Sequence, residues 1–232
     1  YRDIGEGDPL VLLHKFFGSG DDFESVLDEL SPHYRLIIPD LRGHGRSTNP
    51  TGRFTHRQAA LDIFALLDHL DLGAVRAMGV STGGMTLLHM ATSQPERIDA
   101  MVLLGATSYF PVAARPQMRG YSPAGLSPEQ RAGLSEQALA LNRQFATFAD
   151  SYHDMNFTAP LLSTIRAETL IVHGDRDRFF PVSIPVAEYE AIPDSYLWIV
   201  PNGGHIPLIR TERGDRMLTE NVLEFFAGDW RR

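Results

Sequence analysis

The sequence predicts an α/β fold with a mostly parallel central sheet and helices on both of its faces. Short apolar runs that are typical of buried strands alternate with amphipathic stretches along most of the 232-residue chain. Strand–helix–strand units of this kind form right-handed crossovers and therefore a parallel sheet. The alternation stops between residues 108 and 166 and then resumes, which predicts one insertion within a single sheet domain.

The predicted strands are short and mostly apolar. The run Leu10–Leu13 is uninterrupted, as expected for a central strand that is buried on both faces. The remaining predicted strands are Tyr1–Ile4, Tyr34–Ile38, Val75–Met78, Ala100–Leu104, Glu168–His173 and Tyr196–Val200.

The predicted helices each place apolar residues on one side. Asp21 and Asp22 open a helix that runs to about Leu30, and Thr55 caps a long helix that ends near Leu70. Further helices are predicted at Gly84–Ala91, Ser183–Ala191 and Asp215–Phe226.

The insertion is rich in Pro and Gly in its first half and then helical, at residues 128–133 and 135–151. It carries many bulky side chains, among them Phe145 and Phe148. We expect a small helical cap over the carboxyl ends of the strands, with most of its aromatic residues engaged in packing. The predicted organisation is an α/β core at 1–107 and 167–232, divided by a cap at 108–166.

The composition excludes several functions. The net charge of −8, without any basic block, argues against a nucleic-acid or anionic-membrane partner. The absence of cysteine excludes disulfides and thiol catalysis, and no apolar run reaches the length of a membrane span. We expect a cytoplasmic protein, although the chain begins without Met and a leader could have been removed. The sequence does not decide between a monomer and a homodimer.

The stretch Gly79-Val80-Ser81-Thr82-Gly83 lies between a predicted strand and a predicted helix. A sharp strand-to-helix turn on G-x-S-x-G is the nucleophile elbow of α/β hydrolases. The small neighbours allow a strained central residue, and the helix N-terminus favours negative charge beside it. A Gly-rich turn with a solvated serine is the alternative, but the flanking elements favour a catalytic Ser81.

A serine hydroxyl needs a base, which itself needs an orienting carboxylate. In this fold the three residues follow the order Ser, acid, His, each in a loop after a strand. Of the nine histidines, only His205 follows the last predicted strand, in a Gly-Gly-His turn. We interpret the other histidines near strand ends as structural: His14, His44 and His173. For the acid, Asp175 and Asp177 compete.

The whole chain resembles capped α/β hydrolases of the bacterial esterase, lactonase and C–C hydrolase group. The similarity lies in the elbow and in four other segments: His14–Gly20, Asp40–Ser47, Gly174–Asp177 and Gly203–His205. The resemblance implies that Asp177, the last residue of Gly-x-x-Asp, is the acid, and that Asp175 shapes the turn. It also implies an oxyanion hole made by the backbone N–H groups of Phe16 and Thr82, and a bracing role for Asp40–Ser47.

Two residues depart from the family pattern. Thr82 stands where relatives often have Met, Leu or Gln, and Lys15 stands where the pattern has glycine, beside an oxyanion amide. One hypothesis for Lys15, a residue at the rim of the predicted site, is a side chain that points out to solvent. The other places its ammonium within reach of the substrate, where it would favour anionic esters.

These features predict a serine carboxylester hydrolase that acts on small esters through Ser81, His205 and Asp177 and an acyl-enzyme. C–C bond hydrolysis or lactone opening with the same three residues is the enzymatic alternative. A ligand-binding protein without activity is the alternative from another class. Dehalogenase and epoxide hydrolase chemistry would need an aspartate at the elbow. We expect neither a cofactor nor a metal.

Overall fold

The computed structural model describes residues 1–209 and 211–230, and in this part of the chain seven strands form one sheet. Their order is β1-β3-β2-β4-β5-β6-β7, and every neighbouring pair is parallel except β1 with β3. The strands are β1 Arg2–Ile4, β2 Pro9–Leu13, β3 Arg35–Ile38, β4 Val75–Val80, β5 Ile98–Leu104, β6 Glu168–Gly174 and β7 Ser195–Val200. The predicted α/β fold with a mostly parallel sheet is confirmed.

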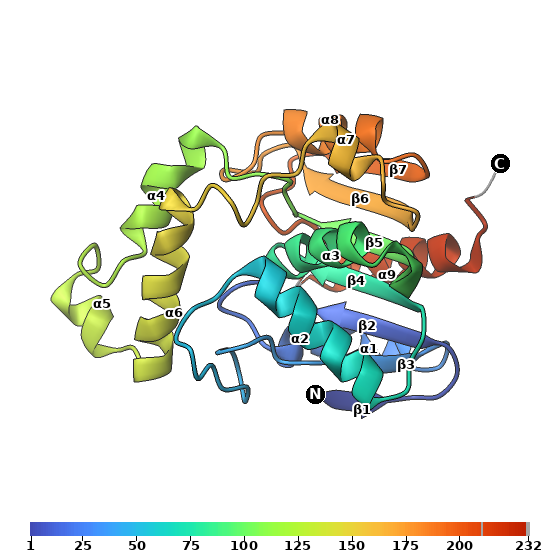
Figure 1. Ribbon diagram of the computed structural model, residues 1–232, viewed down its shortest axis with the longest axis horizontal. Coiled ribbons are helices and arrows are strands. Elements are labelled where there is room, and N and C mark those ends of the chain that lie inside the picture. The colour runs from blue at the N-terminus through green and yellow to red at the C-terminus, as the bar shows by residue number, and fades with distance from the viewer. Residues whose placement is uncertain (210, 231–232) are drawn as a thin grey trace.

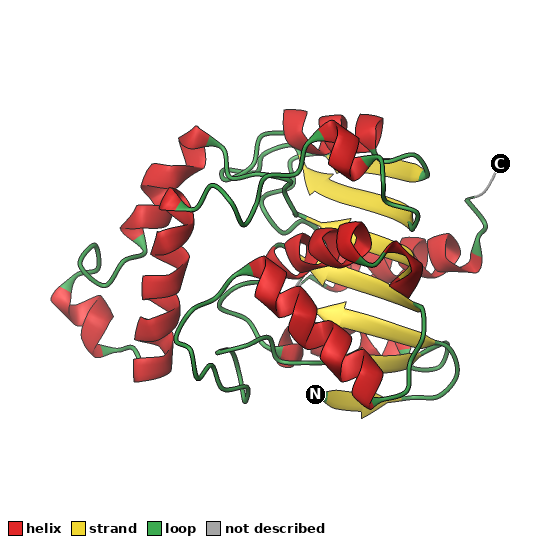
Figure 2. Ribbon diagram, in the orientation of Figure 1, coloured by secondary structure: helices red, strands yellow, loops and turns green. Residues whose placement is uncertain are grey.

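Helices cover both faces of this sheet (Figures 1 and 2). On one face, α1 and α9 pack on alternate strand residues such as Leu10 and Leu12. On the other face, α2, α3 and α8 pack on the intervening residues, such as Val11 and Leu13. The core helices are α1 Glu24–Leu30, α2 His56–His69, α3 Thr82–Ser93, α7 Ala159–Leu162, α8 Ser183–Ala191 and α9 Glu212–Ala227. Short 3-10 turns lie at Gly20–Phe23, Pro95–Arg97, Val112–Ala114 and Phe148–Asp150.

Local sequence explains where several helices begin. Thr55 caps α2 as predicted, because its hydroxyl accepts a hydrogen bond from the Gln58 N–H at 3.1 Å. The last helix begins at Glu212, three residues before the predicted start. Here Thr211 is the cap and its hydroxyl accepts from the Gly214 N–H at 3.1 Å.

The segment between β5 and β6 holds three helices that stand beyond the carboxyl ends of the strands (Figure 1): α4 Arg115–Gly120, α5 Pro128–Ala132 and α6 Glu136–Thr147. Helices α5 and α6 were predicted, whereas α4 and α7 were not. Helix α4 packs against α6, while the short α7 packs against α8 of the core. That residues 108–166 act as a separate cap remains a proposal.

Buried Asp154 ties the returning limb of this segment to the core. Its carboxylate accepts hydrogen bonds from the His56 N–H at 2.8 Å, from His56 Nδ1 at 2.7 Å and from the Arg57 N–H at 3.2 Å. Burial alone would raise the pKa of Asp154, but these bonds outweigh it and lower that pKa to about 2. The carboxylate therefore caps the first turn of α2 and holds the segment in place.

Candidate active site

The strand registers bring four loops together at one edge of the sheet. Leu13 pairs with Gly79, Val80 with Leu104, and Gly174 with Val200, so the parallel strands end side by side. The loops that follow these ends contain all the residues that the sequence predicted for the site. Ligands of open α/β sheets bind at this edge.

The turn at Ser81 has the geometry of a nucleophile elbow. Ser81 has φ 50° and ψ −111°, a conformation that is rare for a residue with a side chain. The turn is tight, and its glycines lie so close to neighbouring backbone atoms that a side chain would not fit. A Cβ at Gly83 would lie 2.0 Å from the Leu13 carbonyl oxygen, and one at Gly79 would lie 2.4 Å from Gly83. The glycines thus allow α3 to start directly against β2 and β4, with the Ser81 hydroxyl projecting from the edge.

Ser81, His205 and Asp177 form a continuous hydrogen-bonded chain. His205 Nδ1 lies 2.8 Å from Asp177 Oδ2, and His205 Nε2 lies 3.0 Å from Ser81 Oγ. Because a carboxylate can only accept, Nδ1 carries the proton and Nε2 is free to accept from the Ser81 hydroxyl. The ring can therefore take the serine proton without rearrangement. In the part of the chain that the structure describes, no hydrogen bond joins His205 to Asp175, the other predicted candidate, whose Oδ1 lies 3.9 Å from Arg176 Nε.

The Asp177 carboxylate is nearly inaccessible but well satisfied. Its Oδ1 accepts from the N–H groups of Phe179 at 2.7 Å and Phe180 at 3.1 Å. Burial would raise the pKa of Asp177, but the hydrogen bond and charge interaction with His205, together with these two amides, lower it. The Asp177 carboxylate is therefore ionised at neutral pH and can hold the His205 ring in one orientation.

The other histidines near strand ends make structural contacts. His14 Nε2 accepts from the Leu41 N–H at 2.9 Å, so its Nδ1 donates to the Lys15 carbonyl at 2.7 Å. Burial lowers the pKa of His14, and burial together with neighbouring His14 lowers the pKa of His44 to about 4. His173 Nε2 donates to the Phe180 carbonyl at 2.9 Å, behind the acid.

The loop after β2 contains a tight turn from Lys15 to Gly18. The Gly18 N–H donates to the Lys15 carbonyl at 3.1 Å, and Phe17 has a φ of 62°, which is unusual for a bulky residue. Within the described residues, no acceptor is bonded to the N–H of Phe16 or of Thr82. Thr82 is also the first residue of α3, where the helix dipole favours negative charge.

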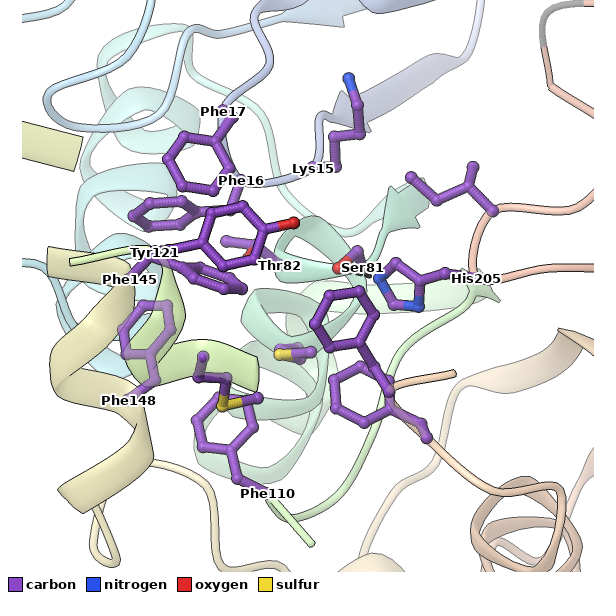
Figure 3. Close-up of a pocket in the computed structure, with 15 residues that line it drawn as sticks. Lys15, Phe16, Phe17, Ser81, Thr82, Phe110, Tyr121, Phe145, Phe148 and His205 are labelled. Atoms are coloured by element: carbon purple, nitrogen blue, oxygen red, sulfur yellow. Dashed lines mark hydrogen bonds between the residues drawn. The ribbon is translucent and has the colours of Figure 1, made fainter. Parts of the chain in front are cut away.

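A cavity of about 120 Å³ opens above Ser81 (Figure 3). Ser81, Thr82 and His205 lie at one side of it, and aromatic rings form most of its wall. The rings come both from the core and from the segment between β5 and β6: Phe16, Phe17, Phe110, Tyr121, Phe145, Phe148, Phe179 and Phe180. Such a surface suits an apolar or aromatic group.

Of these rings, only Phe16 was among the predicted site residues, and the unpredicted ones include Phe179 and Phe180. Their centroids lie 5.1 and 5.2 Å from that of the His205 ring. They confine the imidazole while their backbone N–H groups bind the acid. The sequence feature that could have indicated them is their position, two and three residues after Asp177.

Lys15 does not point at Ser81. Its ammonium turns away from the serine (Figure 3) and lies 2.5 Å from Asp22 Oδ2. Both side chains are largely buried, with 23% of Lys15 and 14% of Asp22 exposed. The charge is therefore neutralised locally by Asp22 rather than lying free in solvent. Because Lys15 also lines the cavity at Ser81, contact of its ammonium with a substrate stays a prediction.

Among the described residues, no group of three or more His, Asp or Glu side chains could hold a metal ion. No helix in residues 1–209 and 211–230 is both long and apolar enough to cross a membrane.

Comparison with known proteins identifies the family. Residues 8–127, about half of the chain, match the model of the alpha/beta hydrolase fold family. The chain belongs to this family. It is 29% identical to 2-hydroxy-6-oxo-2,4-heptadienoate hydrolase of Pseudomonas putida over 255 aligned positions, covering 96% of this chain and 91% of that one.

Solved structures of bacterial family members share the fold. A thermophilic esterase of Thermogutta terrifontis superposes with a TM-score of 0.80 at 24% identity, covering 98% of this chain and 92% of the other. The enol-lactonase of Burkholderia xenovorans superposes with a TM-score of 0.78 at 19% identity, covering 97% and 95%. The proteins that this chain resembles in sequence or in fold thus include a heptadienoate hydrolase, an esterase and an enol-lactonase.

Proposed function

We propose that the protein is a serine carboxylester hydrolase in which Ser81 is the nucleophile, His205 the base and Asp177 the acid. The observation that carries the proposal is the hydrogen-bonded chain from Ser81 through His205 to Asp177 at an elbow with a strained serine. Such a chain activates a hydroxyl that is otherwise a weak nucleophile.

The reaction would proceed in two halves. Ser81 Oγ attacks the ester carbonyl carbon while its proton passes to His205 Nε2. The resulting oxyanion accepts from the N–H groups of Phe16 and Thr82, and its collapse breaks the bond to the alcohol oxygen, which takes the proton from His205. A water then attacks the acyl-enzyme by the same route and releases the acid and free Ser81. Removing one such oxyanion donor typically costs about 10²–10³-fold in kcat.

C–C bond hydrolysis is the second candidate, because the relative that aligns over 96% of the chain acts on a heptadienoate. A heptadienoate is a carboxylate anion and would be stabilised by an unpaired cation in its pocket. Among the described residues that line this cavity, the side chains that can carry a positive charge are Lys15, which is bound to Asp22, and His205 of the proposed triad. The rest of the described wall is mostly aromatic, which favours a neutral ester.

The test is turnover of 4-nitrophenyl butyrate beside turnover of 2-hydroxy-6-oxo-2,4-heptadienoate. The esterase proposal predicts higher kcat/KM for the ester, whereas a C–C hydrolase would prefer the dienoate. A lactone such as dihydrocoumarin distinguishes a lactonase in the same assay. A protein that binds these compounds but hydrolyses none of them would be a ligand-binding member of the family.

A further inference from the structure

A second cavity of about 130 Å³ adjoins the first at the rim of Ser81. Lys15 and Ile206 line both cavities, and Val80, which lines the second, directly precedes the serine. Among the described residues, the remaining walls are Asp22, Phe23 and Ile209, none of which lines the first cavity. The second cavity is therefore a neighbour of the cavity at Ser81 and shares part of its wall.

The two cavities differ in chemistry. Aromatic rings dominate the first, whereas the second has aliphatic walls from Val80, Ile206 and Ile209 and an ion pair between Lys15 and Asp22. An ammonium has three N–H donors, and the described residues provide one bonded acceptor for Lys15, the Asp22 carboxylate. The ammonium thus keeps N–H donors for a ligand while Asp22 offsets its charge, which suits a neutral polar group better than an anion.

We propose that the second cavity binds the alcohol half of the ester and selects a short neutral alcohol that carries a hydroxyl group, such as a glycol or glycerol. The inference rests on the proposed esterase function. Ile206 follows His205, the residue that would protonate the departing alcohol oxygen, so this cavity begins beside the leaving group. The acyl half then lies in the aromatic cavity, and the Lys15 ammonium donates to the hydroxyl of the alcohol.

The experiment compares esters of one acid, because the acyl half and the oxyanion contacts are then constant. The panel is the methyl, ethyl, 2-hydroxyethyl and 2-carboxyethyl esters of butyrate. The native enzyme should favour the 2-hydroxyethyl over the ethyl ester by about tenfold in kcat/KM, since a hydrogen bond to a charged donor has that effect or more.

Three variants test the walls. K15M should abolish the preference for the 2-hydroxyethyl over the ethyl ester. If the substitution also shifts the turn that carries the proposed oxyanion amides, that shift should change kcat/KM equally for these two esters and should not by itself alter their ratio. D22N leaves the ammonium unneutralised and should raise kcat/KM for the 2-carboxyethyl ester at least tenfold relative to the ethyl ester. I209W should reduce the 2-hydroxyethyl to methyl ratio at least tenfold, because Ile209 lines only the second cavity.

V186W is the matched control, because Val186 is exposed on α8 and lines neither cavity. Its ester ratios should equal those of the native enzyme. Equal ratios in the native enzyme, K15M and I209W, with esters still hydrolysed, would overturn the alcohol pocket and leave the esterase proposal standing. Failure to hydrolyse any ester would instead refute the esterase proposal itself.

Discussion

Replacing Asp177 by Asn should abolish most activity for a reason that the hydrogen bonds define. Asp177 Oδ1 accepts from two backbone N–H groups, so in the D177N variant the carbonyl oxygen of the new side chain must take that position. The amide NH₂ then faces His205 Nδ1, which can only accept from it. The His205 proton moves to Nε2, the nitrogen 3.0 Å from Ser81 Oγ, and the ring can no longer accept the serine proton.

The expected loss in kcat is about 10⁴-fold, or about 5 kcal/mol in the activation barrier, as for other triads with the wrong tautomer. The assay is kcat on 4-nitrophenyl butyrate. The control is D175N, because the Asp175 carboxylate is near Arg176 rather than His205, and we expect it to stay within a few-fold of the native enzyme. Equal losses in the two folded variants, or a greater loss in D175N, would refute the assignment of the acid.

Two other predictions concern stability and specificity. Glu188 is buried, and burial raises its pKa from 4.5 to about 8 although neighbouring Ser108 opposes the shift. Between pH 4.5 and about 8 the folded state therefore keeps a proton on Glu188 that the unfolded state loses. As a result, the free energy of unfolding is highest below pH 4.5 and falls as the pH rises to about 8. In urea unfolding between about pH 5 and 8, the free energy of unfolding of E188Q should therefore fall by about 3 kcal/mol less than that of the native protein. F145A should shift acyl preference towards longer chains, whereas F148A, in the fully packed part of the wall, should mainly lower stability, by about 3–5 kcal/mol.

A specific result would contradict each of these predictions. Parallel plots of unfolding free energy against pH for E188Q and the native protein would show that Glu188 is not protonated in the fold. A uniform loss of F145A activity across acetate, butyrate and octanoate esters, in step with its melting temperature, would mean that Phe145 only packs. The native melting temperature in F148A would contradict its core role.

Much of the fold follows from local patterns in the sequence. The apolar runs and helix caps act over a few residues, so Thr55 identifies the start of α2. The loop order places Ser81, Asp177 and His205 at strand ends, and the parallel registers then bring them together. Such features are predictable because neighbouring residues determine them.

Other features depend on contacts that no local pattern reports. The direction of the Lys15 side chain is set by Asp22, which lies seven residues further along the chain, within the 3-10 turn Gly20–Phe23. Helix α4 has only six residues and is stabilised by packing on α6, so its own sequence carries little signal. The second cavity likewise arises from residues of four separate segments.

The central claim is that Ser81 is the nucleophile, and covalent labelling tests it most directly. The protein is incubated with an alkyl fluorophosphonate, and the modified residue is identified by peptide mass spectrometry. We predict one label per chain, on Ser81, with loss of ester turnover in proportion to labelling, and neither labelling nor turnover in a folded S81A variant. A stoichiometric label on another residue, or S81A that still hydrolyses esters at the native rate, would contradict the account.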